Sequence, residues 1–218
     1  MSQTQRVVVV GNGMVGHHFI EQMQTLREQG IPVELTVLSG EPRLAYDRVH
    51  LSAFFNGTTA EELAMTSDAQ YDDWQVNYHV NAMVQQINRE AQQVVTQAGE
   101  RFDYDILVLA TGSYPFVPPI PGNDQPHCLV YRTIDDLHDI QASAAQSKVG
   151  VVIGGGLLGL EAANALQNLG LSTHVVEFAP QLMAVQVDAG GGRMLQEKIS
   201  ELGVQVHTAK ATDRKSVV

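Results

Sequence analysis

The feature that most constrains this 218-residue chain is a strand–glycine turn–helix–strand unit that occurs twice. In the first copy, the apolar run 6–10 passes directly into the glycine turn 11–16. A helical pattern over 14–28 follows, and a second apolar run occupies 33–38. Because β-branched runs without alternation are typical of buried parallel strands, this order predicts the βαβ unit of a parallel sheet. The apolar face of the helix is expected to contain Val15, Phe19, Met23 and Leu26.

The second copy repeats the same order further along the chain. A strand over 150–153 leads into the glycine turn 154–159. A helix over 160–169 and a strand over 173–177 complete the unit. The two turns lie 143 residues apart, and an internal repeat on this scale indicates two related domains. The repeat predicts an α/β fold with two Rossmann-like dinucleotide-binding domains, the second one truncated.

Further strands and one long connection are predicted around the two copies. Strand-like runs occur at 76–80, 93–96 and 105–110, and several prolines then indicate an extended connection. After the second copy, a helix is expected over 188–202 and a strand over 204–207. We therefore expect the first part of one domain over 1–120, a connection over 121–146, and a partial second domain over 147–212.

The glycine turns predict where nucleotides bind. A strand that turns sharply into a helix gathers backbone N–H groups and the positive helix end at one point, which suits a pyrophosphate. In such a turn the first glycine permits the bend, the second lets the phosphate approach, and the third lets the helix pack on the strand. Turns used only for packing are the alternative. The cofactor-binding residues expected here are Gly11, Gly13, Met14 and Gly16 in the first turn, and Gly154, Gly156, Leu158 and Gly159 in the second.

Acidic residues at the ends of the second strands are candidates for holding ribose hydroxyls. Glu177 lies 18 residues after Gly159, close to the spacing that this role requires. A carboxylate there repels a 2′-phosphate, and no Lys or Arg occurs in 178–181, so the sequence favours NAD(H) over NADP(H). The alternative is that Glu177 only caps a strand end. In the first unit the candidate acid is Glu41.

Other reactive side chains give weaker signals. Adjacent residues on a helix point in different directions, so His17 and His18 are interpreted as surface or packing residues. The remaining histidines lack metal-ligand spacing, and a metal site is not expected. Cys128 is interpreted as a packing residue, and no hydrolase motif is present.

Composition excludes several classes of protein. The formal net charge of −11 argues against a nucleic-acid-binding surface. One cysteine can supply neither an intramolecular disulfide nor a four-cysteine metal site. No secretory leader and no apolar run long enough to span a membrane are recognised, so no membrane association is expected and the cytoplasm is the expected location.

Together with the two turns, the Ala-Thr-Gly segment at 110–112 and Arg132 resemble the flavoprotein reductases that have two dinucleotide domains. The resemblance implies that the first domain binds FAD and the second NAD(H). It further implies that Thr111 and Gly112 line the flavin, and that Arg132 contacts the FAD phosphates or ribose. Disulfide-reducing members carry a cysteine pair after the first acid strand. The segment 46–52 has none, which excludes dithiol chemistry.

Among the flavoprotein reductases that lack this cysteine pair, the chain most resembles the amino-terminal part of the large subunits of cytoplasmic NADH-dependent nitrite reductases. The residues that carry this resemblance are 9–17, 41–52, 110–115 and 154–163, of which 46–52 is the most specific. The resemblance implies hydride transfer from NADH to FAD, then electron transfer to metal centres that reduce nitrite to ammonia. It implies no acid–base residue in this chain. Siroheme and an iron–sulfur cluster are expected only in the remainder of such a protein. The partners that the resemblance implies are a small nitrite reductase subunit and further copies of the complete chain.

Two alternatives remain open. One is a free-standing NADH-dependent reductase of the ferredoxin or rubredoxin type, or the electron-transfer subunit of an assimilatory nitrate reductase. The other is a non-catalytic nucleotide-binding module. The chain alone is expected to be inactive on nitrite. The segment 213–218 departs abruptly from the resemblance and can be encoded by the start of a common sequencing adapter, so we expect it to be an artefactual tail.

Overall fold

The computed structural model describes residues 4–212, which form two compact units. Among the described residues, the first unit holds 4–48 and Thr59–Ser113, and the second holds Val49–Thr58 and 114–212. This division follows how the chain packs. The segment expected to be an artefactual tail, 213–218, lies outside the described residues.

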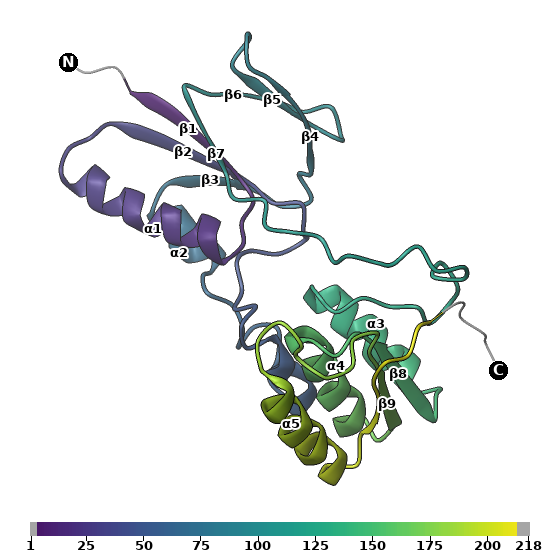
Figure 1. The fold of residues 1–218 in the computed structure, drawn as a ribbon. Helices are drawn as coiled ribbons and strands as arrows, with labels where there is room; N and C mark the ends of the chain where they lie inside the picture. The colour runs from purple at the N-terminus through teal and green to yellow at the C-terminus, as the bar shows by residue number, and fades with distance from the viewer. Residues whose placement is uncertain (1–3, 213–218) are drawn as a thin grey trace. The chain divides into compact units, whose positions relative to one another are not determined.

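A four-stranded parallel sheet in the order β3-β2-β1-β7 forms the centre of the first unit (Figure 1). Its strands are β1 (Gln5–Val10), β2 (Val33–Leu38), β3 (Val76–His79) and β7 (Ile106–Leu109). Val10 pairs with Leu38 on one side and with Leu109 on the other, so the carboxyl ends of three strands meet at one edge. The predicted βαβ unit is confirmed, with α1 (Met14–Glu28) between β1 and β2.

Both faces of this sheet are buried. On one face, Val7 and Val9 pack with residues of α1 and of α2 (Asp68–Asp73). On the other face, Val8 and Val10 pack against the small antiparallel sheet made by β4 (Val84–Asn88), β5 (Gln93–Thr96) and β6 (Arg101–Asp103). A strand covered on both sides needs apolar residues at every position, which explains why β1 shows no alternation.

The apolar face predicted for α1 was wrong in part. Met23 is buried as expected, but Val15 is 73% exposed and Leu26 is 36% exposed. The buried stripe instead contains Gly16, His17, Ile20 and Met23. Two members of this stripe are invisible to a count of apolar residues, because glycine has no side chain and histidine is polar.

The second unit repeats the same architecture on a smaller scale. Its parallel sheet has the order β10-β9-β8, formed by β8 (Val149–Ile153), β9 (Ser172–Val176) and β10 (Gln205–His207). Helix α4 (Leu157–Asn168) connects β8 to β9, and α5 (Ala189–Glu201) precedes β10, as the sequence predicts. The core contains Ala163, Val175, Leu182 and Val204.

Two elements in this unit lie outside the repeated pattern. Helix α3 (Ile134–Ala144) lies within the range 121–146 that was expected to be a connection, and it begins with a capping box between Thr133 and Asp136. The short helix η1 (Leu51–Asn56) contacts α4. Among the described residues, no helix combines the length and the apolar character needed to cross a membrane.

Candidate nucleotide-binding sites

The first glycine turn lies at the carboxyl edge of the central sheet of the first unit. The N–H of Gly11 donates to the carbonyl of Leu38 at 2.8 Å, which ties the turn to β2. Helix α1 begins at Met14, and its N-cap, Gly13, has an extended backbone and no side-chain hydrogen bond. The first N–H groups of α1 are therefore not capped by the side chain at this position. Such a helix end attracts anions, because the partial positive charge of the helix is concentrated there.

The three glycines of this turn meet different surroundings. Gly11 has a φ of +108°, and a Cβ atom there would lie 2.2 Å from the carbonyl oxygen of Ala110. A Cβ atom on Gly16 would lie 2.0 Å from the carbonyl oxygen of Gly11. At Gly13 the nearest atom would be Nε of Arg48, 3.9 Å away. Two glycines thus permit close packing, while the middle one leaves open backbone that a pyrophosphate could approach.

The second turn has a related geometry. Gly154 has a φ of +118°, and its N–H donates to the carbonyl of Val176 at 2.8 Å. A Cβ atom on Gly159 would lie 2.0 Å from the carbonyl oxygen of Gly154, whereas one on Gly156 would meet no atom within 4 Å. Leu158, in the first turn of α4, is 55% exposed. In the second turn, Gly159 therefore permits close packing, as Gly16 does in the first, whereas Gly156, which corresponds to Gly13, is open.

Glu177 lies directly beside the second turn, at the end of β9. Its Oε2 accepts from the N–H of Gly155 at 2.5 Å, and its Oε1 accepts from the N–H of Ala179 at 2.6 Å. Sequence spacing therefore identified a carboxylate that contacts the glycine turn. An ionised carboxylate has about four lone-pair positions, so these two bonds leave capacity for ribose hydroxyls. The same bonds also fit the alternative in which Glu177 only orders the loop.

Glu41 follows β2 in the first unit, and both of its carboxylate oxygens have protein partners. Oε2 accepts from the hydroxyl of Tyr46 at 2.7 Å, and Oε1 forms an ion pair with Arg48. The guanidinium of Arg48 also lies over the ring of Tyr46, 4.7 Å from the centroid. Since Arg48 is also the nearest neighbour of the open Gly13 position, it links the acid to the turn.

Sequence reasoning did not identify Arg48 as a site residue. It lies in the specific segment 46–52, but no periodicity or spacing relates it to a turn more than thirty residues earlier. The signal that could have found it is chemical. An arginine seven residues after a candidate ribose-binding acid can pair with that acid and also face a diphosphate.

The other candidates are distributed between the two units. Thr111 and Gly112 are exposed and follow β7, and the backbone nitrogen of Thr111 would lie 3.0 Å from a Cβ atom on Gly11. The structure thus brings Thr111 beside the first turn, and Gly112 follows it in the chain. Met14 starts α1 and is half-buried. Arg132 belongs to the second unit, where its backbone N–H donates to Oδ2 of Asp136 at 3.0 Å.

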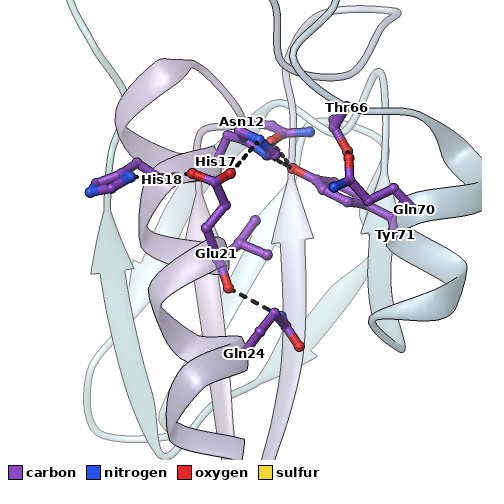
Figure 2. Close-up of polar contacts among 9 residues, drawn as sticks. Asn12, His17, His18, Glu21, Gln24, Thr66, Gln70 and Tyr71 are labelled. Atoms are coloured by element: carbon purple, nitrogen blue, oxygen red, sulfur yellow. Dashed lines mark hydrogen bonds and ion pairs between the residues drawn. The ribbon is translucent and has the colours of Figure 1, made fainter. Parts of the chain in front are cut away.

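The two adjacent histidines do point in different directions. His17 is buried and hydrogen-bonds Tyr71, whereas the side chain of His18 is 68% exposed (Figure 2). Cys128 is half-buried, and its Sγ lies 3.4 Å from the carbonyl oxygen of Gly122. Within residues 4–212, no group of three or more His, Cys, Asp or Glu side chains is arranged to hold a metal ion.

Comparison with known proteins gives consistent matches. The chain is 55% identical over 206 residues to the nitrite reductase [NAD(P)H] large subunit of Klebsiella oxytoca, which covers 94% of this chain and 21% of that protein. It is 50% identical over 207 residues to the nitrite reductase (NADH) large subunit of Escherichia coli, covering 95% and 24%. The chain therefore spans about a quarter or less of the length of these relatives.

A solved structure with a similar fold is a ferredoxin reductase of Rhodopseudomonas palustris. It has 27% sequence identity and a TM-score of 0.87, and the match covers 98% of this chain and 52% of that one. The family model of the pyridine nucleotide-disulphide oxidoreductases matches residues 5–216. This chain belongs to the pyridine nucleotide-disulphide oxidoreductase family.

Proposed function

We propose that this chain is the flavoprotein reductase module of an NADH-dependent nitrite reductase large subunit, with FAD at the first glycine turn and NADH at the second. The observation that carries the proposal is the pair of turns with an open middle glycine, each in a unit whose second strand is followed by a carboxylate. The identity to the Klebsiella oxytoca and Escherichia coli large subunits supports nitrite as the final electron acceptor.

In the first unit, the open backbone at Gly13 and the start of α1 receive the FAD pyrophosphate. Glu41 lies near the adenosine ribose, and its ion pair with Arg48 offsets the repulsion between this carboxylate and the diphosphate. Thr111 and Gly112 border the flavin. A contact between Arg132 and FAD stays a prediction.

In the second unit, the open backbone at Gly156 receives the NADH pyrophosphate, and Glu177 accepts hydrogen bonds from the ribose hydroxyls. Because residues 178–181 contain no cation, a 2′-phosphate would meet a carboxylate without a compensating charge. This arrangement favours NADH over NADPH.

The two glycine turns would hold FAD and NADH, and the bound cofactors would supply hydride transfer from the nicotinamide to the flavin and single-electron transfer onward. The residues of this chain bind and orient the two nucleotides, and none is assigned an acid–base role. Siroheme and the iron–sulfur cluster are proposed to belong to other parts of the complete protein. We further propose that the complete protein works with a small nitrite reductase subunit, forms a homo-oligomer and is located in the cytoplasm.

The test uses the full-length gene product, purified with its cofactors. NADH-dependent formation of ammonia from nitrite is expected, with NADPH supporting a much lower rate. Rapid reduction of an added ferredoxin without any ammonia would instead support a free-standing reductase. The fold that this chain shares with a ferredoxin reductase makes that the second candidate.

A further inference from the structure

The two glycine turns differ at their second residue. In the second turn this residue is Gly155, whose backbone N–H is bound by Glu177. In the first turn it is Asn12, which carries a side-chain amide and is only 6% exposed. Because a buried amide must find partners for both of its polar atoms, Asn12 gives the first turn a chemical property that the second turn lacks.

One end of the Asn12 amide is fixed by a buried network between α1 and α2 (Figure 2). The hydroxyl of Tyr71 donates to Oδ1 of Asn12 at 2.8 Å. Nδ1 of His17 lies 3.1 Å from the same hydroxyl. The other ring nitrogen of His17, Nε2, lies 3.6 Å from Oε1 of Glu21 on the same helix. Tyr71 and His17 are 0% and 1% exposed, so solvent does not compete for these bonds.

The other end of the amide, Nδ2, is buried and has no hydrogen-bond partner among the described residues. It is a donor that can pair only with an acceptor atom. The atoms that a dinucleotide presents beside a glycine turn are phosphate and ribose oxygens, which are acceptors.

We propose that Nδ2 of Asn12 donates a hydrogen bond to a phosphate or ribose oxygen of the dinucleotide bound at the first turn, and that Tyr71 and His17 are positioning residues that hold the amide in this orientation. The proposal rests on the proposed function, which assigns FAD to that turn. It extends the binding site from the glycine backbone to a side-chain network that reaches α2.

The network is needed because an asparagine amide rotates easily about its last torsion. Without the Tyr71 hydroxyl, the amide can turn so that Oδ1 replaces Nδ2. A carbonyl oxygen would then face the anionic diphosphate, which converts an attraction into a repulsion. Removing one hydroxyl at a distance from the nucleotide should therefore weaken its binding.

The test measures FAD binding to the full-length gene product after its flavin has been removed. We expect Tyr71→Phe and Asn12→Asp each to raise the FAD dissociation constant by about tenfold. Asn12→Asp keeps an acceptor for Tyr71 but loses the donor and adds a negative charge, so Asn12→Ala, which loses the donor without adding a charge, should also raise the FAD dissociation constant. The dissociation constant for NADH should stay unchanged in both variants.

Tyr78→Phe is the matched control. Tyr78 packs edge-on against Tyr71, with ring centroids 5.7 Å apart, and its hydroxyl bonds to the side chain of Asp68 instead. This variant removes one hydroxyl from the same aromatic cluster without touching the bond to Asn12, so it should leave the FAD dissociation constant unchanged.

A double-variant cycle separates positioning from a general structural role. If Tyr71 acts through Asn12, adding Tyr71→Phe to Asn12→Ala should weaken FAD binding no further. The proposal for Asn12 would be overturned, with the proposed function left standing, by either of two results. One is a double variant whose FAD dissociation constant rises by the product of the two single effects, and the other is an Asn12→Asp variant that binds FAD as tightly as the unchanged protein. An unchanged protein that takes up no FAD would overturn both this proposal and the proposed function.

Discussion

At the scale of single residues, the glycines of the first turn separate folding from binding. Gly11 and Gly16 lie against backbone carbonyl oxygens that cannot move aside, whereas a Cβ atom on Gly13 would meet only the side chain of Arg48, 3.9 Å away. Three glycines within one six-residue turn therefore differ in role, because Gly11 and Gly16 have no room for a side chain and Gly13 does. Substitutions at these positions should therefore affect different measurable quantities.

We predict that Gly13→Val abolishes FAD retention while the fold persists. A valine there fills the space assigned to the pyrophosphate, and the φ of −88° at Gly13 suits any residue. The FAD dissociation constant of the full-length protein should rise by at least about tenfold, measured by flavin fluorescence. Gly16→Val is the contrasting variant, because its Cβ would collide with the Gly11 carbonyl and lower the free energy of unfolding by about 3 kcal/mol. Full flavin retention in Gly13→Val would mean that the first turn is only structural.

Glu177 should determine the choice between NADH and NADPH. Replacing it with arginine exchanges repulsion of a 2′-phosphate for attraction, so Glu177→Arg should shift the ratio of dissociation constants toward NADPH by about tenfold or more. Glu197→Arg, at an exposed position of α5, makes the same change in net charge and should leave the ratio unaffected. Equal use of both nucleotides by the unchanged protein would contradict the role given to Glu177.

At the scale of elements, the sequence predicted most helices and strands, because glycine punctuation and apolar runs are local signals. The bounds of α1 and β2 agree with the expected ranges 14–28 and 33–38. What local signals miss are contacts between distant segments. The Tyr71–Asn12 bond joins residues 59 positions apart. Helix α3 was missed because its range was interpreted as a connection.

The buried His17 should make stability depend on pH. Burial lowers the pKa of His17, and Glu21 opposes this effect. Below about pH 6.5 an unfolded histidine binds a proton that the folded one resists. The free energy of unfolding should therefore reach its highest value above that pH, where His17 is neutral in both states. It should decrease as the pH drops toward the lowered pKa of the folded state.

This prediction is tested by chemical denaturation of the full-length protein at a series of pH values. His17→Asn should reduce the pH dependence between about pH 7 and 5, although it lowers stability overall. His18→Asn is the matched control, since the His18 side chain is 68% exposed, and it should keep the dependence of the unchanged protein. Identical pH profiles for both variants would contradict the assignment to His17.

At the scale of the whole molecule, the proposal divides the work between this chain and the rest of a longer protein. Reduction of nitrite to ammonia consumes six electrons and, in the proposed scheme, takes place at siroheme beside an iron–sulfur cluster. Such clusters are held by several cysteine thiolates. This chain contains one cysteine, Cys128, which cannot hold such a cluster alone, so the proposed scheme assigns it electron supply and not the metal chemistry.

We therefore expect residues 1–218, expressed alone and supplied with NADH, FAD and nitrite, to form no ammonia above a protein-free blank. The full-length gene product should form it under the same conditions, which controls for the assay. Ammonia formed by the 218-residue chain alone would contradict the proposed division between electron supply and nitrite reduction.

The proposed function requires that NADH bound at the second turn reduces FAD bound at the first. Its most direct measurement is the absorbance of the oxidised flavin in the full-length protein, followed without oxygen after addition of one equivalent of NADH or NADPH. NADH is expected to bleach the flavin band within the time of turnover, and NADPH is expected to do so far more slowly. A flavin band left unchanged by NADH, with both nucleotides demonstrably bound, would contradict it and favour a non-catalytic nucleotide-binding module.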